Sequence, residues 1–490
     1  MRRPRLQCLL TDRKAAVRCL NSRKAAPKPS VLEMRGSDDM VKWLERVDHT
    51  VPAFDLSRMR LQALTADQMD EVNALDIIHV SGTNGKGSVC AFTSSFLRTY
   101  SRLRQYPRTV GLYTSPHIET VRERIRINGE PISEELFAKR FFEVWNKLPK
   151  ESSKDLDVPR YLQLLALLSF HVFISEKVDV GIYETHLGGE YDATNIVVKP
   201  IATAVTTIAD DHMNLLGPTI EDIAWHKSGI FKEEVPAFSS PQTTLVEKVL
   251  RKRAADRNTT LDIVTLNHTL EGKTYLRLPN VQKTNCSLAL ALVNAYIRAK
   301  ISIVQQPISA TELLASCQNP IWPGRFQHIC KDNLQLYIDG AHNASGIFHA
   351  VEWYADSVSK IATQNPTRIL IFSHFSRRSV DELLRCVASH LRKNEILVHN
   401  VIFTSYNTGR DGINSIERNL QNRYDPKVLE ECRLTWQVLE QRSTIFLCDT
   451  IEKALKKAGD LANNAGGAEA LILGSLHLVS GILCLLGSAE

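Results

Sequence analysis

The sequence predicts an α/β protein with two domains, each built on a parallel sheet. Three observations support this fold class. At 490 residues the chain is too long for one hydrophobic core. Apolar, strand-like runs alternate with helical patterns, which is typical of parallel sheets covered by helices on both faces. A glycine-rich loop follows the first such run, so we expect a P-loop N-terminal domain, and a second α/β pattern predicts a smaller C-terminal domain.

The predicted elements follow in chain order. Short apolar runs predict buried strands, and they lie at 77–80, 109–113, 178–183, 201–206, 336–338, 369–372 and 471–473. Longer apolar patterns predict helices, at 89–97, at 161–174 and after 473. Two prolines and a glycine in 319–324 predict the domain boundary, giving domains of 34–319 and 320–490. The polar segment 405–442 predicts an insertion or mobile loop.

The loop GTNGKGS at 82–88 is the most informative stretch. Its glycines let backbone N–H groups turn toward phosphate oxygens, and Lys86 adds a positive charge. A following helix would direct its positive N-terminus at the same phosphates. The loop departs from the strict P-loop pattern, because Gly87 separates Lys86 from Ser88. A nucleotide triphosphate site is the favoured interpretation, and an ordinary glycine-rich turn is the alternative.

The net charge of +6 resides in the N-terminal segment. Residues 1–30 carry nine Lys or Arg and one acid, an excess of +8, which leaves −2 for the rest of the chain. This argues against a nucleic-acid partner. A basic, acid-poor leader over 1–33 is typical of mitochondrial targeting, with a disordered basic tail as the alternative. Initiation at Met34 would give a second, cytosolic form.

Ten cysteines without a C-x-x-C pair predict a reduced, intracellular protein without a zinc site. The most apolar segment, 470–487, is interrupted by glycine, serine and histidine. It predicts a buried strand and a helix, and therefore no membrane insertion.

Eight motifs occur in order along the chain, from residue 82 to residue 479. They are GTNGKGS at 82–88, TSPH at 114–117 with RERIRING at 122–129, ETHLGGEYDATN at 184–195, DHMNLLG at 211–217, HKSGIFK at 226–232, WPGRFQ at 322–327, DGAHN at 339–343 and GSLHLV at 474–479. This series resembles the folylpolyglutamate synthases of the Mur ligase superfamily, in their fungal or lower-eukaryotic form. The resemblance implies a two-domain Mur-ligase-like fold, in which a P-loop ATPase domain is followed by a smaller, Rossmann-like C-terminal domain, and it implies a monomer.

The resemblance also implies a reaction. An ATP-dependent ligase would phosphorylate the terminal carboxylate of a reduced folate, and the amine of L-glutamate would attack the acyl phosphate. The implied catalytic residues are Lys86, Lys227 and His342. The implied ATP contacts are Gly85, Lys86, Gly87, Ser88, Asn285, Arg325 and Asp339. The implied Mg²⁺ ligands are Ser115, Glu184, His212 and Lys227. Whether a monovalent cation such as K⁺ is also needed is not decided by the sequence.

Each implied role has a structural alternative. Ser115 could be a turn residue, Glu184 a surface carboxylate at a strand end, and His212 a helix-capping group. Hard oxygen ligands and an imidazole nevertheless suit Mg²⁺. Lys227 matches a position where the lysine is carbamylated in the family. Its alternative is a plain lysine that contacts phosphate or Asp222.

The second domain would supply further contacts. Arg325 matches an arginine that reaches the phosphates, and guanidinium is suited to bidentate phosphate contact. Asp339 matches a ribose-binding aspartate, and His342 would help to position the acyl phosphate or glutamate. Asn285 matches an asparagine that contacts adenine. Its alternative is the N-cap of a helix over 286–297.

Several departures from the family pattern limit the resemblance. Glu190 stands where relatives often have arginine, and Ala344 stands where bacterial members often have proline. Residues 376–379 read SRRS where many members have an Arg-Asp pair, and glutamate binding or chain-length preference is the property that this departure would change. Dihydrofolate synthase, which acts on dihydropteroate, is the nearest alternative. A P-loop kinase and a non-enzymatic nucleotide-binding or RNA-binding protein are more remote.

Overall fold

The computed structural model describes most of the chain in two compact units. The described residues are 12–25, 40, 43–44, 46–47, 71–148, 159–271, 278–300, 308–318, 322–359, 366–375, 380–409 and 424–487. Unit 1 comprises residues 1–117 and 122–320, and unit 2 comprises 118–121 and 321–490. The proposed start at Met34, the boundary residues 319–321 and the SRRS segment at 376–379 lie outside the described residues.

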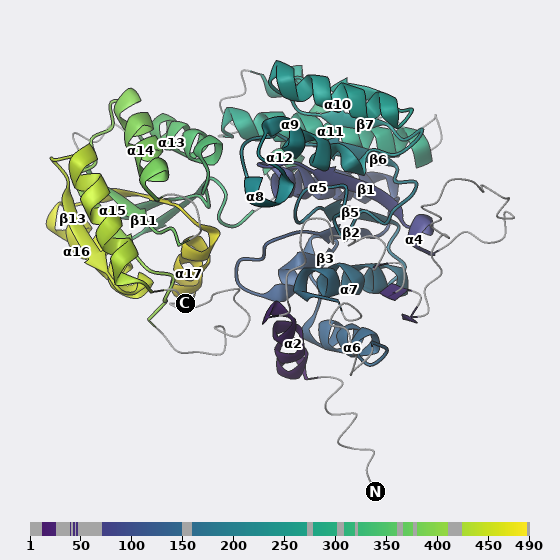
Figure 1. Cartoon of the computed structure of the whole chain (residues 1–490), viewed down its shortest axis with the longest axis horizontal. Helices are drawn as coiled ribbons and strands as arrows, with labels where there is room; N and C mark the ends of the chain where they lie inside the picture. Colours follow the sequence, from purple (N-terminus) through teal and green to yellow (C-terminus); the bar gives the residue numbers. More distant parts are fainter. Residues whose placement is uncertain are drawn as a thin grey trace, which may run out of the picture. The chain divides into compact units, whose positions relative to one another are not determined.

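Unit 1 contains an eight-stranded sheet in the order β4-β3-β2-β5-β1-β6-β7-β8 (Figure 1). The strands are β1 (Asp76–Ser81), β2 (Val110–Tyr113), β3 (Ile125–Ile127), β4 (Glu130–Pro131), β5 (Val180–Glu184), β6 (Ala202–Val205), β7 (Ala237–Ser239) and β8 (Leu261–Ile263). The pairs from β2 to β8 are parallel, whereas β3 and β4 add an antiparallel edge. The four central strands are fully buried, which explains their continuous apolar runs.

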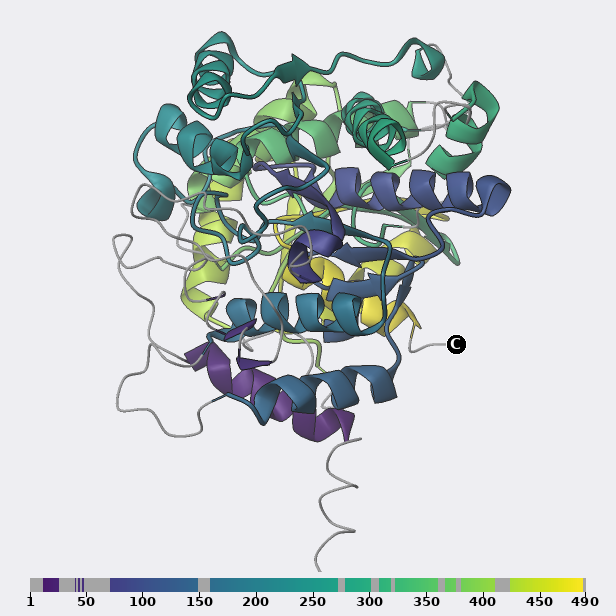
Figure 2. The same cartoon turned by 90° about the vertical axis from the view of Figure 1, so that its right-hand side faces the viewer.

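Helices cover both faces of this sheet. They are α2 (Arg13–Ser22), α4 (Glu71–Ala74), α5 (Lys86–Arg104), α6 (Glu134–Trp145), α7 (Tyr161–Ser175), α8 (Met213–Leu216), α9 (Ile220–Lys227), α10 (Thr244–Asp256), α11 (Asn280–Lys300) and α12 (Ala310–Gln318). Short 3₁₀ turns lie at Arg23–Ala25, Val121–Arg124, Ser228–Ile230 and His268–Leu270. Helices α11 and α12 pack on α5, and α6 packs on α7. Helices α5 and α7 lie on opposite faces (Figures 1 and 2).

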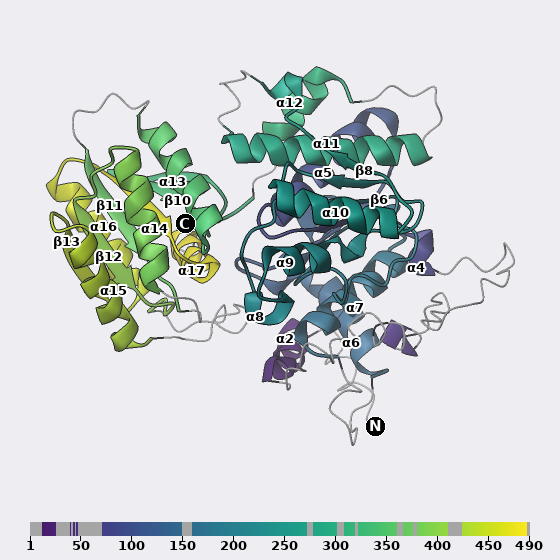
Figure 3. The same ribbon diagram turned by 45° about the horizontal axis from the view of Figure 1, so that its top comes forward.

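Unit 2 contains a six-stranded sheet in the order β13-β12-β11-β14-β10-β9. Its strands are β9 (Gln327–Lys331), β10 (Leu334–Ile338), β11 (Thr367–Phe372), β12 (Asn400–Thr404), β13 (Thr444–Cys448) and β14 (Ala468–Leu473). Only β9 among these described strands runs antiparallel to its neighbour. Its helices are α13 (Ala344–Val358), α14 (Val380–Lys393), α15 (Pro426–Leu439), α16 (Ile451–Asn464) and α17 (Leu476–Gly487). Helices α13, α14 and α15 share one apolar core and α16 and α17 the other (Figures 1 and 3).

The structure confirms the α/β class and the predicted strands, whose ends shift by one to three residues. It also shows antiparallel edges that the prediction of parallel sheets omitted. The helix after the glycine loop begins at Lys86, three residues before the predicted Val89, because Gly85 occupies its N-cap. No described helix is long and apolar enough to cross a bilayer.

The prediction of a loop over 405–442 is wrong for its second half. Residues Pro426–Leu439 form α15, which begins with an Asp425 N-cap and a proline in its first turn. Leu429, Cys432 and Trp436 recur at helical spacing and are buried in the core of unit 2. Charged residues between them concealed this apolar stripe. The preceding residues 410–423 lie outside the described part.

The basic leader contains a helix that packs on unit 1, so the disordered-tail alternative is wrong for residues 13–25. Asp12 caps α2, and α2 packs against α6 and α7 (Figures 1 and 2). Ala16, Val17 and Leu20 form its buried apolar face. Arg13 also pairs with Glu134 at the start of α6. These contacts make residues 12–25 part of the folded unit.

We therefore expect Leu20→Ala to lower the free energy of unfolding of the full chain by about 2–4 kcal/mol, the usual cost of emptying a buried leucine site. Urea denaturation followed by circular dichroism measures this. Arg18→Ala is the matched control on the exposed face of the same helix, with an expected change within about 0.5 kcal/mol. Equal, small effects of the two substitutions would show that α2 does not pack as described.

Candidate functional site

The candidate site lies at the carboxyl edge of the unit 1 sheet. Neighbouring strands β2, β5, β1 and β6 all run in one direction, so the segments that follow them meet at that edge. Ser115 follows β2, Glu184 ends β5, the glycine loop follows β1, and Asp211 and His212 follow β6. This is the edge where open α/β sheets bind ligands.

The glycine loop connects a buried strand directly to a helix N-terminus. Gly82 and Gly85 have φ angles of +140° and +91°, which side chains strongly disfavour. Lys86 Nζ donates to the carbonyl oxygens of Gly82 and Thr83, at 3.0 and 3.3 Å. The amides of Thr83 and Asn84 both donate to the carbonyl of Thr207, so this strand-exit segment fixes the loop. The loop therefore presents a helix N-terminus and an ammonium group at one point.

Lys227 joins Lys86 at the same carbonyl. It ends α9, is 3% exposed, and donates from Nζ to Gly82 O at 2.8 Å. Burial, with a smaller contribution from nearby Lys86, lowers the pKa of Lys227 to about 7, while Asp211 and Asp192 oppose the shift. The alternative contact with Asp222 is wrong, because that carboxylate accepts instead from Thr219 N and Oγ1. A lysine with so low a pKa carries a neutral amine for much of the time near neutral pH.

Glu184 is a buried carboxylate beside this loop. It is 3% exposed, so the alternative of a surface carboxylate is wrong. Val80 of β1 is its register partner, which places it next to the start of the loop. It accepts hydrogen bonds from Thr114 Oγ1 and, at 3.0 Å, from the amide of Ser115. The structure thus brings together two of the predicted metal ligands, Ser115 and Glu184.

His212 is placed differently from the other predicted ligands. It occupies the N-cap of α8 with a φ of +54°, but its side chain forms no capping hydrogen bond, so the capping alternative is wrong. The side chain is 52% exposed, and Nε2 lies 3.5 Å from Oδ1 of buried Asp211. Among the described residues, no three His, Cys, Asp or Glu side chains form a metal cluster. Asp211 is a further buried carboxylate at this edge that sequence reasoning passed over.

Asn285 lies within α11, which begins at Asn280, so the N-cap alternative is wrong. It is buried, and a Cβ added to Gly85 would lie 2.7 Å from its Oδ1. Its Nδ2 donates to Gln282 Oε1 at 2.9 Å, and Gln282 Nε2 donates to Ser88 Oγ at 3.1 Å. A hydrogen-bonded chain thus joins α11 to the first turn of α5.

The three predicted site residues of unit 2 lie close together in sequence and space. Asp339 follows β10, is buried, and accepts from the amide of Phe326 at 2.9 Å. Burial raises the pKa of Asp339, and the Arg325 guanidinium opposes the shift. A Cβ on Gly340 would lie 3.2 Å from Arg325 Nη1, and His342 Nδ1 lies 2.9 Å from Gly340 O. These residues form a compact turn at the carboxyl edge of the unit 2 sheet.

A buried polar relay lies under the unit 1 site, and sequence reasoning missed it. His79 Nε2 is 2.8 Å from Thr194 Oγ1, which donates to Asp192 Oδ1 at 2.7 Å. Asp192 lies 3.5 Å from His186 Nδ1, and His186 Nε2 lies 2.6 Å from the Tyr113 hydroxyl. Burial lowers the pKa of His79 to about 3, so this imidazole is neutral. The motifs ETH and DATN contain His186, Asp192 and Thr194, but the residues that complete the relay, His79 and Tyr113, lie on other strands.

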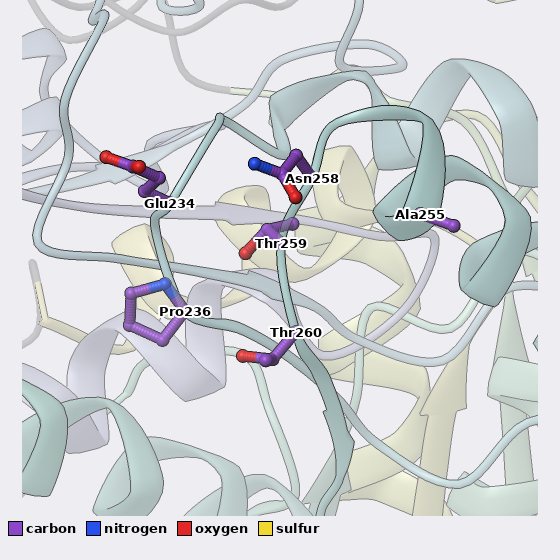
Figure 4. A pocket seen from close by; sticks show the side chains of 6 residues that line it. All are labelled: Glu234, Pro236, Ala255, Asn258, Thr259 and Thr260. Atoms are coloured by element: carbon purple, nitrogen blue, oxygen red, sulfur yellow. The ribbon is translucent and has the colours of Figure 1, made fainter.

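One hollow of about 530 Å³ lies elsewhere in unit 1 (Figure 4). It is lined by Glu234, Pro236, Ala255, Asn258, Thr259 and Thr260. None of these is a predicted site residue. The nine described cysteines are free thiols, and none of them is among the predicted site residues.

Comparison with known proteins gives relatives across most of the chain, although no protein-family model matches it. Folylpolyglutamate synthase of Neurospora crassa is 35% identical over 446 residues, 86% of this chain and 83% of that protein. A probable folylpolyglutamate synthase of Schizosaccharomyces pombe is 38% identical over 434 residues, 86% of each chain. Folylpolyglutamate synthase of Saccharomyces cerevisiae is 39% identical over 436 residues, 84% of this chain and 77% of that protein.

Solved structures show the same fold. Mycobacterium tuberculosis folylpolyglutamate synthase, complexed with ADP and AMPPCP, has a TM-score of 0.74 at 20% identity, covering 97% of this chain and 99% of that one. The bifunctional folylpolyglutamate synthase/dihydrofolate synthase of Yersinia pestis, complexed with AMPPNP and a manganese ion, has a TM-score of 0.71 at 21% identity, covering 98% and 99%.

Proposed function

The chain belongs to the folylpolyglutamate synthases of the Mur ligase family, ATP-dependent ligases that add glutamate to folates, and on this premise we propose how its residues divide the reaction. Unit 1 would activate the γ-carboxylate of a reduced folate as an acyl phosphate. The amine of L-glutamate would then form the amide and release inorganic phosphate. The products are ADP, phosphate and a folate one glutamate longer.

The observation that carries this proposal is the convergence of two lysine side chains on one loop carbonyl. Lys86 and Lys227 both donate to Gly82 O, directly at the N-terminus of α5. The Lys86 ammonium group and the helix N-terminus suit the β- and γ-phosphates of ATP, and Lys227 lies beside them. Gly85, Gly87 and Ser88 would contribute backbone and hydroxyl contacts, and Asn285 would reach the base from α11.

The residues at this edge also fit a divalent cation. The buried Glu184 carboxylate uses Oε2 for the Thr114 and Ser115 donors, and within the described part of the chain no hydrogen bond engages Oε1. Ser115 and His212 add oxygen and nitrogen donors of the kinds that accept Mg²⁺. When bound, the metal ion would neutralise charge on the phosphates and on the acyl phosphate. The manganese of the Yersinia pestis protein is consistent with this proposal.

Lys227 is suited to carbamylation. Its low pKa provides the neutral amine that carbon dioxide requires. The nitrogen forms a bond to the carbon of CO₂ and loses a proton to solvent, which leaves an anionic carbamate. This group would exchange a repelling ammonium for an oxygen ligand near the γ-phosphate. The test is to add short-chain carboxylates to Lys227→Ala and to measure ligase activity. If Lys227→Ala is inactive and the carboxylates do not restore its activity, the proposal that Lys227 is carbamylated is contradicted.

Unit 2 would complete nucleotide and substrate binding. Arg325 would bind phosphate, the neighbouring Asp339 would bind the ribose, and His342 would orient the acyl phosphate or the incoming glutamate. The Asp339 carboxylate accepts a hydrogen bond from the amide of Phe326. This bond fixes the turn that carries Arg325. Glutamate binding by residues 376–379 stays a prediction, because these residues are not described.

A single substrate comparison separates this function from dihydrofolate synthase, which shares the fold. The full chain is supplied with MgATP, L-glutamate and either tetrahydrofolate or dihydropteroate, and products are identified by mass spectrometry. We expect successive glutamyl additions to tetrahydrofolate with one ADP per addition. One addition to dihydropteroate alone would identify a dihydrofolate synthase instead.

We further propose that the protein acts in mitochondria as a monomer. The nine cations in residues 1–30 support import, and initiation at Met34 would give a cytosolic form. Because α2 packs on unit 1, a form without residues 1–33 would lose part of that surface. Fluorescent fusions of the full chain and of the Met34 form would test the localisation, and both forms in the cytosol would contradict it.

A further inference from the structure

Glu190 lies where its own loop meets the end of α9 and the side of α10. Its carboxylate pairs with Arg253 on α10 and, at 3.3 Å, with Arg257 at the C-cap of that helix. These arginines are four residues apart, so they share one helix face. Arg253 is 7% exposed, and its guanidinium lies 4.4 Å from the ring centroid of Trp225 on α9. Helices α9 and α10 pack side by side (Figure 3).

The main chain of Glu190 is bonded to the turn that carries Lys227. Its amide donates to His226 O at 2.8 Å. Asn195 Nδ2 bridges Glu190 O and Gly229 O, both at 3.1 Å. The fit is close: a Cβ on Gly229 would lie 2.4 Å from Glu190 Cα, and a Cβ on Gly189 would lie 2.6 Å from Lys227 O. The loop and the turn therefore hold each other on both sides of Lys227.

Glu190 also balances a local excess of positive charge. Besides the two arginines, Lys232 lies close by, with Nζ 3.4 Å from Asn195 O. Burial and the charge of Arg257 lower the pKa of Lys232 to about 8, and Glu190 opposes this shift. Without the Glu190 charge, three cations would face one another in a partly buried space. Their repulsion would push α10 away from the loop and loosen the turn.

We propose that the Glu190–Arg253 pair is a clamp that positions Lys227 at the carbonyl of Gly82. Both are positioning residues, since their contacts are with the loop and helices rather than with substrate. This inference rests on the proposed role of Lys227 at the phosphates. It also explains the departure of Glu190 from arginine: here the positive partners come from α10.

The test is a double-mutant cycle between Glu190→Gln and Lys227→Ala, read out as kcat. We expect Glu190→Gln alone to lower kcat about 30-fold, because small misplacements of a reacting group cost this much. The KM for folate should stay within about twofold, since Lys227 faces the phosphates. In the Lys227→Ala background the same substitution should lower kcat no further. Additive losses, or an unchanged kcat in Glu190→Gln, would overturn the clamp.

Hydrogen exchange of the ligand-free protein separates this inference from the proposed function. We expect the amides of 226–230 to exchange at least about tenfold faster in Glu190→Gln, with the α10 amides 246–254 unchanged. Unchanged exchange at 226–230 overturns the clamp even if Lys227 is essential. Full activity of Lys227→Ala would instead refute the proposed function. The matched control is Glu247→Gln, which breaks the exposed Glu247–Arg251 pair on α10 and should change neither readout.

Discussion

Lys227→Met is expected to lower ligase activity on the order of 10³-fold and, at the same time, to make the metal-free protein harder to unfold. Burial lowers the pKa of Lys227 from 10.5 to about 7 in the folded state. Folding near neutral pH therefore forces this amine toward its neutral form or buries a charge, and both cost free energy. Methionine removes that cost, and Lys86 still donates to Gly82 O. We expect a gain of about 2 kcal/mol in the free energy of unfolding near pH 7.

The pH dependence has a definite sign. Between about pH 7 and pH 10.5 the unfolded chain holds a proton that folded Lys227 has lost, so the stability of the wild-type protein rises with pH. The advantage of Lys227→Met is therefore full at pH 7 and below, and it disappears as the pH approaches 10.5. Urea denaturation in buffers free of CO₂ and divalent metal measures this difference. An advantage that grows with pH would contradict the assignment.

Lys248→Met is the matched control for this measurement. Lys248 lies on α10 and is exposed, so its replacement should change the free energy of unfolding by less than about 0.5 kcal/mol at any pH. Its activity should equal that of the wild-type protein. The activity of Lys227→Met should fall on the order of 10³-fold or more, since several kcal/mol of phosphate stabilisation are lost.

Glu184→Gln should have a comparable effect on catalysis. The amide keeps the shape of the carboxylate, and its carbonyl oxygen can still accept from Thr114 and Ser115, but it loses the charge that would hold Mg²⁺. We expect kcat to fall on the order of 10³-fold. The Mg²⁺ concentration for half-maximal rate should rise at the same time. Initial rates over a Mg²⁺ titration measure both quantities.

Glu135→Gln is the control for the loss of one carboxylate. Glu135 is exposed on α6 in the same unit, so this variant should retain its rate and its Mg²⁺ dependence. If Glu184→Gln showed an unaltered Mg²⁺ dependence, Glu184 would not be a metal ligand. Its buried contacts with Thr114 and Ser115 would then be purely structural.

Local sequence patterns predicted the features that local chemistry determines. The apolar run before GTNGKGS gave β1, and polar residues after other apolar runs placed Ser115 and Glu184 at one edge, because parallel strands end together. The shared hydrogen bonding of Lys86 and Lys227 could not be read in this way. It depends on a contact across 145 residues between Lys227 and Gly82.

Features that depend on distant partners were missed. From the sequence, Glu190 was interpreted only as a local change of charge. Its partners Arg253 and Arg257 lie 63 and 67 residues away along the chain. The packing of the leader was missed as well, because the role of Leu20 is visible only against α6 and α7. Helix α15 was hidden for a related reason: its apolar stripe is narrow, and only the core of unit 2 shows what it packs against.

The central claim is that ATP activates the γ-carboxylate of the folate as an acyl phosphate. Transfer of oxygen from the substrate to the released phosphate tests it most directly. The γ-carboxylate of the folate substrate is labelled with ¹⁸O, and the inorganic phosphate released with MgATP and L-glutamate is analysed by mass spectrometry. In the acyl-phosphate route a carboxylate oxygen becomes the bridge to phosphorus and leaves with it when the amine attacks. We predict one ¹⁸O in each phosphate released. Phosphate without label, at normal rates of glutamate addition, would contradict activation of the carboxylate by ATP.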